Sequence, residues 1–349
     1  MDTEHHELHK NAILLSLIVP VYNEEESVNA FFTRIDAVFA DMEDVRLEIV
    51  FVNDGSTDNT LAALLQRRQS DTRIVVIDLS RNFGKEAALS AGLRTASGDC
   101  VIPMDADLQD PPELIPAMLK KWKEGYEVVL ARRTCRDTDS WFKRTSARWF
   151  YRVHNIFAEP PLPENVGDFR LMDRVVVDAL NTLPESCRFM KGLFAWVGFR
   201  TTSIGYSREA RQTGTSKFNA WKLWNFALEG ITGFSTAPLR IWTYFGLFLA
   251  LSGFAYAAWI ILKVLLCGVD VPGYASLIVM ILCLGGIQLI GIGVLGEYLG
   301  RTYIESKNRP TYIIRRRYGR NDTCSSTGER AVDGKNSGSC GRQQRSSIM

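Results

Sequence analysis

Three carboxylates follow one short apolar segment of the sequence. The stretch "MDADLQDPPEL" (104–114) contains Asp105, Asp107 and Asp110, with Gln109 between the last two. Carboxylates this close repel one another unless something positive lies among them. Alternation along a strand end points Asp105 and Asp107 to the same side, and Gln109 adds a neutral oxygen. The pattern therefore predicts a divalent cation site, the alternative being an acidic turn that caps the next helix without any ligand.

The composition limits the class of protein. The chain has 349 residues, a formal net charge of +2 and seven scattered cysteines without CxxC spacing. This length favours one large domain with appendages, and the small charge gives no global basic field for nucleic acid. We expect no disulfide framework and no zinc site. Residues 1–12 are polar and not typical of a signal peptide, so we expect a disordered N-terminus in the cytoplasm.

Two uncharged segments predict membrane anchoring. Residues 241–262 and 275–295 each exceed the roughly 20 residues that a bilayer requires of a helix. We therefore expect two transmembrane helices, at about 241–266 and 274–296, within a region spanning 236–300. A pair of buried core helices is the alternative.

Charge around these segments predicts their orientation. Basic residues concentrate in 301–317, whereas the short loop between the two segments carries only Lys263. Both termini are therefore expected on the cytoplasmic side of an inner (plasma) membrane. The Ser, Gly and Arg-rich residues 318–349 predict a disordered tail. The string "GIGVLG" (291–296) lies inside an apolar segment, so it predicts close helix packing and self-association to a homo-oligomer rather than a dinucleotide loop.

The first half of the chain predicts an α/β fold. Short apolar runs alternate with stretches of helical spacing, which indicates a mostly parallel sheet covered on both faces. The clusters "PVYNEEES", "NDGSTDNT" and "MDADLQD" follow strand ends, where such sheets bind ligands. Each of the first two is also typical of a plain turn or helix N-terminus. The expected strands are 14–22, 47–52, 74–79, 100–104 and 127–131.

Four motifs together resemble a known family. "SLIVPVYNEEESV", "FVNDGSTDNT", "RNFGKEAALSAG" and "DADLQDPPE" are similar to the family 2 glycosyltransferases of the GT-A fold (Rossmann-like), and the resemblance covers nearly the whole chain except its ends. It implies that Pro20, Tyr22, Glu24 and Asp54 cradle the nucleobase of a sugar nucleotide. It also places Lys85 beside the nucleoside.

The resemblance also assigns the centre of the site. It implies that Asp105, Asp107 and Gln109 hold Mg²⁺ or Mn²⁺ on the donor diphosphate, with Asp105 also on the nucleotide side. A hard cation would neutralise the charge that builds on the leaving group. Asp168 of "VGDFRLMDR" lies where this family keeps its candidate catalytic base, and Arg170 flanks it. A surface Asp before a short strand is the alternative for Asp168.

A basic loop predicts a phosphate site. In "YSREARQTGTSKF" (206–218), Arg208, Arg211 and Lys217 surround a Gly, Ser and Thr-rich turn, which suits phosphate through side chains and backbone N–H groups. A solvated basic loop is the alternative.

Two cationic, aromatic-rich stretches predict contact with lipid. Residues of about 140–157 and 217–234 have the pattern of helices that lie in a membrane interface, although their apolar faces could instead pack on the catalytic domain, expected at 13–235. With "FMKGLFAWVG" and "GGIQLIGIGVLGEYLGRTYIE", this arrangement resembles the polyprenyl-phosphate glycosyltransferases, especially the bactoprenol type of O-antigen glucosylation. A polyprenyl phosphate acceptor follows from that resemblance.

The resemblance implies one inverting, metal-dependent transfer of glucose from UDP-glucose to undecaprenyl phosphate. The "QxxRW" signature of processive synthases is absent, which favours a single transfer. Another donor, a UDP-aminoarabinose derivative or GDP-mannose, is an alternative. So is a non-catalytic scaffold, although Asp107 and Asp168 are both retained. Because a phosphate monoester has a second pKa near ~6, Asp168 is expected to orient substrates at least as much as to act as a base.

Overall fold

The computed structural model describes residues 12–134, 166–185, 188–206, 237–267 and 273–319. The stretches near 140–157 and 217–234, and the predicted phosphate ligands Arg208, Arg211 and Lys217, lie outside the described residues. The same holds for the terminal segments 1–11 and 320–349, for which disorder was expected.

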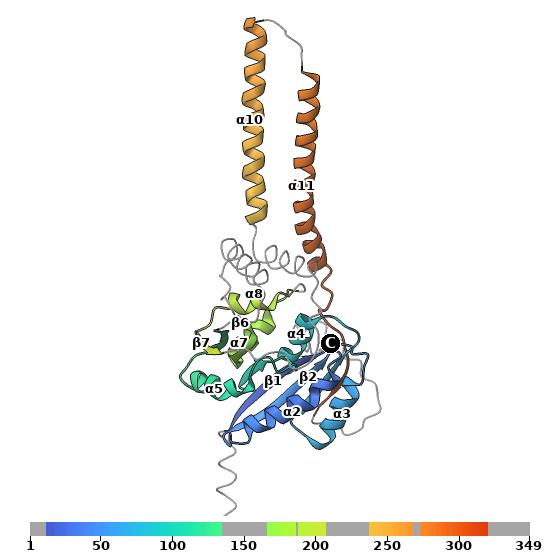
Figure 1. Cartoon of the computed structure of the whole chain (residues 1–349), viewed down its shortest axis with the longest axis vertical. Helices are drawn as coiled ribbons and strands as arrows, with labels where there is room; N and C mark the ends of the chain where they lie inside the picture. Colours follow the sequence, from blue (N-terminus) through green and yellow to red (C-terminus); the bar gives the residue numbers. More distant parts are fainter. Residues whose placement is uncertain (1–11, 135–165, 186–187, 207–236, 268–272, 320–349) are drawn as a thin grey trace, which may run out of the picture.

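The described residues form a sheet domain that carries a pair of long helices (Figure 1). The strands are β1 (Ile13–Val21), β2 (Val45–Asn53), β3 (Ile74–Leu79), β4 (Cys100–Pro103), β5 (Val128–Arg133), β6 (Val166–Asp173), β7 (Thr201–Tyr206) and β8 (Ile314–Tyr318). The helices are α2 (Glu25–Phe39), α3 (Thr60–Ser70), α4 (Lys85–Thr95), the short 3-10 turn η1 (Pro112–Leu114), α5 (Ile115–Lys123), α7 (Arg174–Thr182), α8 (Met190–Trp196), α10 (Ala237–Cys267) and α11 (Tyr274–Ser306).

All eight described strands join one sheet, in the order β7-β5-β6-β4-β1-β2-β3-β8. The central strands β4, β1, β2 and β3 are parallel to one another, whereas β6 and β8 run antiparallel to the central strands beside them. The predicted α/β fold with a mostly parallel sheet is confirmed. Each of the five strands expected from the sequence begins and ends within two residues of the observed one.

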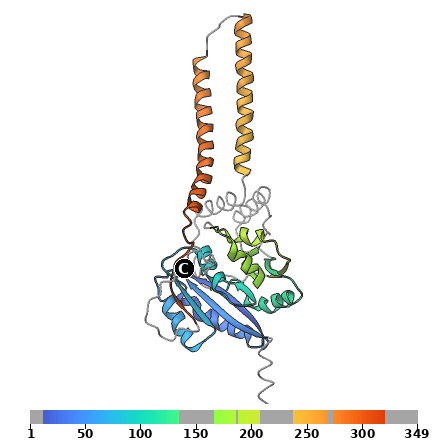
Figure 2. The ribbon, with the colours of Figure 1, turned by 180° about the vertical axis from the view of Figure 1, so that it is seen from behind.

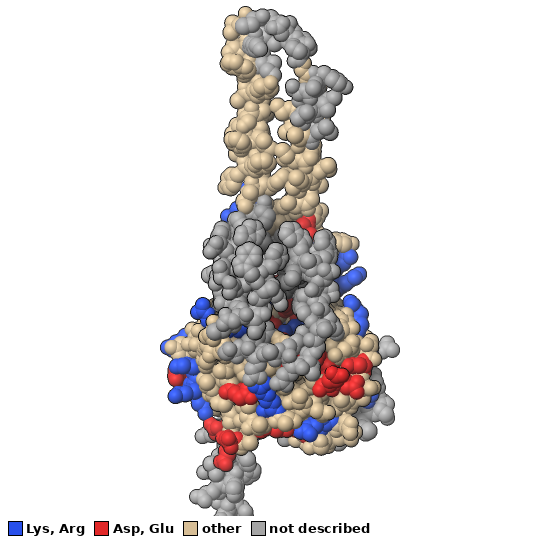
Figure 3. Space-filling model, viewed as in Figure 1, with Lys and Arg blue, Asp and Glu red and all other residues tan. Residues whose placement is uncertain are grey.

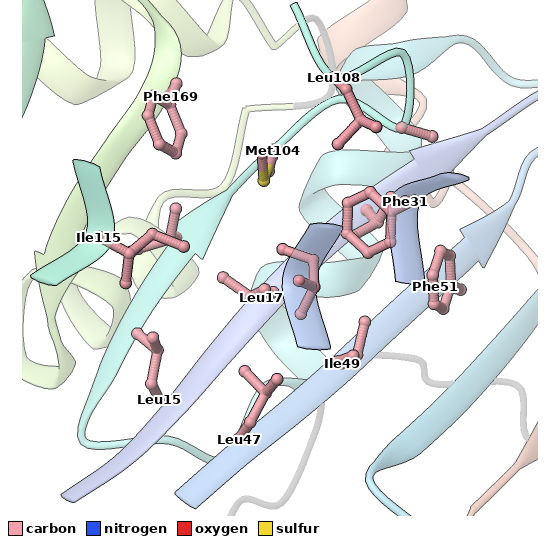
Figure 4. Close-up of a cluster of buried hydrophobic side chains, with 14 of the residues drawn as sticks. Leu15, Leu17, Phe31, Leu47, Ile49, Phe51, Met104, Leu108, Ile115 and Phe169 are labelled. Atoms are coloured by element: carbon pink, nitrogen blue, oxygen red, sulfur yellow. The ribbon is translucent and has the colours of Figure 1, made fainter. Parts of the chain in front are cut away.

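Alternating side chains of the central strands build a core on each face of the sheet. Leu17 faces α2, where Phe31 packs edge-on against Phe51 with ring centroids 5.6 Å apart (Figure 4). Ile18, the next residue, faces α4 and contributes to the core that includes Leu89. Full burial of each such side chain contributes roughly 1.5–3 kcal/mol. Because both faces are covered, polar groups are left to the loops at the strand ends.

The helix pair, α10 and α11, projects from the sheet domain with the two helices side by side (Figures 1 and 2). Its large apolar side chains are exposed, among them Phe254 and Leu266, and most of its described surface carries no charge (Figure 3). Cys283–Ser306 is the one stretch of the described residues that is long and apolar enough to cross a membrane. Gly291 lies against Trp242, where a Cβ would come within 1.9 Å of the indole nitrogen, so this glycine permits close packing of the pair.

Strand β8 extends the sheet beyond what the sequence suggested. The segment follows α11 and pairs antiparallel with β3, so the chain returns from the helix pair to the sheet domain. From the sequence, 301–317 was expected to be a basic segment and 318–349 a disordered tail, so a strand at Ile314–Tyr318 was not expected. The strand "IRRRY" has no apolar run, so its sequence does not predict a strand. An edge strand tolerates charged residues because one of its sides is exposed to water.

Candidate active site

The loops after β1 and β2 are tied together by hydrogen bonds. The Asn23 N–H donates to Ser56 Oγ (3.0 Å), and Asn23 Oδ1 accepts from the Thr57 N–H (2.8 Å). The Glu24 N–H donates to Thr60 Oγ1 (3.0 Å). Residues 22–24 and 54–59, here called the paired loops, therefore form one unit at the carboxyl end of the sheet.

The predicted nucleobase residues of the first strand lie at this end. Pro20 is the penultimate residue of β1, Tyr22 follows the strand with 41% of its surface exposed, and Glu24 accepts a hydrogen bond from Ser27 Oγ (2.7 Å). The structure thus brings all three to the rim of the paired loops. Their contact with a nucleobase stays a prediction.

Asp54 fixes a neighbouring turn, a structural role that its sequence motif does not indicate. Its side chain is buried, and its two oxygens accept from the N–H groups of Phe83 (2.7 Å) and Gly84 (2.9 Å). Burial raises the pKa of Asp54, while these two hydrogen bonds lower it by less. Gly55 makes the approach possible, because a Cβ there would lie 2.5 Å from the carbonyl carbon of Arg81. Asp54 thereby fixes the turn that ends at Lys85, the first residue of α4.

A charged cluster lies at the centre of the site. Lys85 Nζ is 2.7 Å from Asp105 Oδ1 and 2.9 Å from Asp168 Oδ2. The three residues, here called the Lys85 cluster, come from α4, from the loop after β4 and from β6. Asp168 Oδ1 is buried and has no hydrogen-bond partner among the described residues. The structure therefore joins three predicted site residues and leaves one buried carboxylate oxygen without a hydrogen bond among the described residues.

Opposite charges keep Lys85 and Asp168 ionised. Burial raises the pKa of Asp168, but the charges of Lys85, Lys191 and Arg170 and the Lys85 hydrogen bond lower it further, to about 2. Burial lowers the pKa of Lys85, but Asp168 and Asp105 raise it well above its ordinary value. Near neutral pH the Asp168 carboxylate is therefore ionised and faces the Lys85 ammonium.

Two further charged residues at the site were missed from the sequence. Glu86 accepts from the Met190 N–H (3.2 Å) at the start of α8, and burial together with Asp168 raises the pKa of Glu86 to about 7. The charge of Lys191 lowers the pKa of both Glu86 and Asp168. Their positions in the sequence could have indicated them, because Glu86 directly follows the predicted site residue Lys85 and Lys191 lies in the motif "FMKGLFAWVG".

Arg170 supports the strand that carries Asp168. The residue is 4% exposed, its Nη2 donates to the Gly167 carbonyl (2.7 Å), and its guanidinium lies 4.2 Å from the centre of the Phe194 ring. The hydrogen bond lies within β6, and the contact with the Phe194 ring joins β6 to α8. The predicted catalytic role of Arg170 stays a prediction.

Asp110 is separated from the other acidic residues of its loop. It is buried and accepts a hydrogen bond from the Tyr206 hydroxyl, to which Arg133 Nε also donates (3.2 Å). Burial and the charge of Asp110 raise the pKa of Tyr206 to about 12. Asp110 thus anchors the acidic loop to β5 and β7.

The side-chain oxygens of Asp105, Asp107 and Gln109 are of the type that binds a divalent cation. Asp107 Oδ1 accepts from the Gln109 N–H (3.2 Å), and Leu108 between them has a φ of 54°, which residues other than glycine rarely adopt. No three acidic, His or Cys side chains group around one point in the part of the chain that the structure describes. The site still fits a hard cation such as Mg²⁺, which takes one or two carboxylates and completes its shell with substrate phosphates. The unpartnered Asp168 Oδ1 also indicates a polar ligand here.

Known proteins match both parts of the chain. Residues 16–180 match the profile Glycosyl transferase family 2, and residues 237–302 match the GtrB C-terminal hairpin. The bactoprenol glucosyl transferase of Shigella phage SfV is 55% identical over 301 residues, which cover 86% of this chain and 98% of the relative. An uncharacterized glycosyltransferase of Synechocystis is 54% identical over 302 residues, which cover 86% and 95%.

A solved structure also aligns with the chain. It is the glucosyl-3-phosphoglycerate synthase of Mycobacterium tuberculosis in complex with Mn²⁺, UDP-glucose and phosphoglyceric acid, at 18% identity and a TM-score of 0.42, covering 65% of this chain and 81% of that one. The sequence matches reported above extend over the sheet domain and the helix pair alike. This chain is a glycosyltransferase and belongs to glycosyl transferase family 2, among the members that carry the GtrB C-terminal hairpin.

Proposed function

We propose that the chain transfers a single glucose from UDP-glucose to undecaprenyl phosphate, with inversion, at the cytoplasmic face of the inner membrane. The observation that carries this proposal is the 55% identity to a bactoprenol glucosyl transferase across both the sheet domain and the helix pair. The geometry agrees, because the hydrogen-bonded paired loops and the Lys85 cluster lie together at the carboxyl end of the sheet, where such sheets bind ligands.

The donor would bind between the paired loops and the acidic loop. Pro20, Tyr22, Glu24 and Asp54 would contact or shape the nucleobase pocket from the β1 and β2 ends. Asp105, Asp107 and Gln109 would hold Mg²⁺ or Mn²⁺, which when bound would neutralise the charge that develops on the departing diphosphate.

Asp168 would orient the reacting groups. An acceptor phosphate is already mostly ionised at neutral pH, since its second pKa is near ~6. A carboxylate with a pKa of about 2 has little tendency to take a proton at that pH. Its Oδ2 holds Lys85, which leaves Oδ1 to position the acceptor or the sugar.

The acceptor implies a site at the membrane. We propose that α10 and α11 both span the bilayer, with both termini cytoplasmic. This is supported by the apolar stretch Cys283–Ser306, by the exposed apolar side chains of α10 and by the match to the GtrB hairpin. Arg208, Arg211 and Lys217 would bind the acceptor phosphate, and the segments near 140–157 and 217–234 would lie along the lipid surface. Self-association through the glycines of α11 stays a prediction.

The test is transfer of radiolabelled sugar in membranes. UDP-glucose, a UDP-aminoarabinose derivative and GDP-mannose are offered with undecaprenyl phosphate and Mn²⁺. We expect UDP-glucose alone to label the lipid, and expect EDTA or Asp107→Ala to abolish labelling. The matched control is Asp178→Ala, an exposed carboxylate of α7. Labelling by another sugar would replace the donor assignment, and no labelling by any of the three would favour the scaffold alternative.

A further inference from the structure

The strand that follows the helix pair turns one arginine toward β3. In the β8 pairing, Asp78 lies opposite Arg316 and Leu79 lies opposite Ile314, so Arg315 falls where the register shifts. Such a β-bulge disturbs the regular alternation of a strand and re-aims a side chain. Arg315 therefore points to the neighbouring strand although the adjacent Arg316 is the residue paired with Asp78.

Arg315 contacts β3 and the residue that follows it. Its Nη1 lies 3.4 Å from Asp78 Oδ2, and its Nη2 donates to the Ser80 carbonyl (2.7 Å). The Ser80 N–H in turn donates to the Ile313 carbonyl (2.9 Å). The side chain of Asp78 is only 3% exposed, whereas that of Arg315 is 59% exposed. A carboxylate this buried is costly without a cationic partner, so the contact matters more than an ordinary surface ion pair.

Hydrogen bonds continue from Asp78 to the paired loops. Asp78 Oδ1 accepts from Asn53 Nδ2 (2.8 Å), and Asn53 Oδ1 accepts from the Ser56 N–H (3.3 Å). Asn53 is 1% exposed and directly precedes Asp54. Ser56 Oγ accepts from the Asn23 N–H (3.0 Å), which reaches the loop after β1. An unbroken series of polar contacts thus runs from β8 to both loops.

We propose that Arg315 is a positioning residue for nucleotide binding. Through Asp78 and Asn53 it fixes the turn at residues 53–57, so that the affinity for the donor depends on the strand that returns from the helix pair. The inference rests on the proposed function for the identity of the nucleotide. The ordering of the turn itself can be measured without any ligand.

The test compares Arg315→Met with Arg316→Met in the full chain in detergent. Arg316→Met removes the same charge from the same strand, and the Arg316 guanidinium lies 5.2 Å from the centre of the Tyr318 ring instead of at the loops. UDP binding is measured by calorimetry with Mn²⁺, and amide hydrogen exchange is followed over residues 53–57. Loss of a hydrogen-bonded ion pair of this kind is expected to weaken the affinity for UDP about 10-fold.

We expect Arg315→Met to weaken UDP binding about 10-fold and to accelerate exchange at 53–57, with Arg316→Met close to wild type. Arg315→Lys, which keeps the charge facing Asp78, should recover part of the affinity. Equal UDP affinity and equal exchange in the two methionine variants would overturn the proposal. So would exchange that accelerates throughout β1 and α2, which would show a general loss of stability. If the wild type binds no UDP, the donor assignment fails, and local exchange at 53–57 alone upholds or overturns the role of Arg315.

Discussion

The paired loops and the Lys85 cluster satisfy their polar groups in different ways. In the paired loops, backbone N–H groups and side chains bond to one another, as Asn23 does with Ser56 and Thr57. In the Lys85 cluster, one ammonium lies between two carboxylates and Asp168 Oδ1 has no partner among the described residues. The two regions lie at the same end of one sheet, so the difference arises from the residues placed there rather than from the sheet itself.

This difference suggests that the paired loops serve donor binding and that the Lys85 cluster serves the transfer reaction. Loops that are already bonded internally keep their shape when a ligand arrives, which limits the ordering cost of binding. A cluster of charges held by few contacts can exchange partners when diphosphate, cation or acceptor enters, and its charges can then stabilise the charge that develops in the transition state. Substitutions in the cluster should therefore reduce turnover, whereas those in the loops should reduce donor affinity.

The largest effect is expected from Asp168→Asn. The substitution keeps the shape but removes the negative charge and replaces one of the two oxygens with an NH2 group. One side-chain oxygen then cannot both hold Lys85 and orient the reactants. Turnover should fall about 10³-fold, with UDP affinity nearly unchanged. Sugar transfer and UDP binding are measured from pH 6 to 9, with Asp178→Asn as the control. Activity that returns at high pH would show that Asp168 acts mainly as a base.

A smaller effect is expected from Lys85→Met. It removes the only cation within hydrogen-bond reach of both Asp105 and Asp168 among the described residues, so the two carboxylates lose their partner. Turnover should fall about 10²-fold, a typical result of deleting one electrostatic contact in a transition state. Lys121→Met, which breaks a surface pair with Glu124, is the matched control. Equal turnover in the two variants would remove Lys85 from the chemistry.

The strands of the sheet were easier to predict from the sequence than the side-chain contacts at its carboxyl end and the edge strand β8. Apolar runs identified five strands, and family motifs brought Lys85, Asp105 and Asp168 to one site. Neither could reveal that Lys85 bridges the two carboxylates, because Lys85 and Asp168 are far apart in the chain and the contact is tertiary. β8 was missed since "IRRRY" has no apolar run, and its pairing depends on the open edge of β3. Glu86 was missed because its raised pKa arises from burial and from the charge of Asp168, which is distant in the chain.

For the paired loops, the informative change is Asp54→Asn. An amide retains one acceptor but turns an N–H donor toward one of the N–H groups of Phe83 and Gly84, which now bond to carboxylate oxygens. The cost is about 2 kcal/mol of folding free energy, with a rise of about 10-fold in the KM for UDP-glucose and little change in kcat. Thermal unfolding and initial rates test this, with the exposed Asp44→Asn as control. A fall in kcat at unchanged KM would place Asp54 with the Lys85 cluster instead.

The smallest effect expected is a change in how stability depends on pH in Glu86→Gln. The pKa of Glu86 is about 7 in the native chain and 4.5 as its ordinary value. Between these values the native chain holds a proton that the unfolded chain releases, so the free energy of unfolding falls as the pH rises from 4.5 to 7.

Glutamine keeps an acceptor for the Met190 N–H and does not titrate, so this component of the fall should vanish. Relative to pH 5, the variant should gain on the order of 1 kcal/mol over wild type at pH 8. Melting temperatures across this range test the effect, with surface Glu124→Gln as control. The charged groups facing Glu86 are Lys85 on α4, Asp168 on β6 and Lys191 on α8, and their balance sets the shift. A slope in Glu86→Gln equal to that of the wild type would mean that Glu86 stays ionised beside the cluster, with Lys85 and Lys191 compensating its burial.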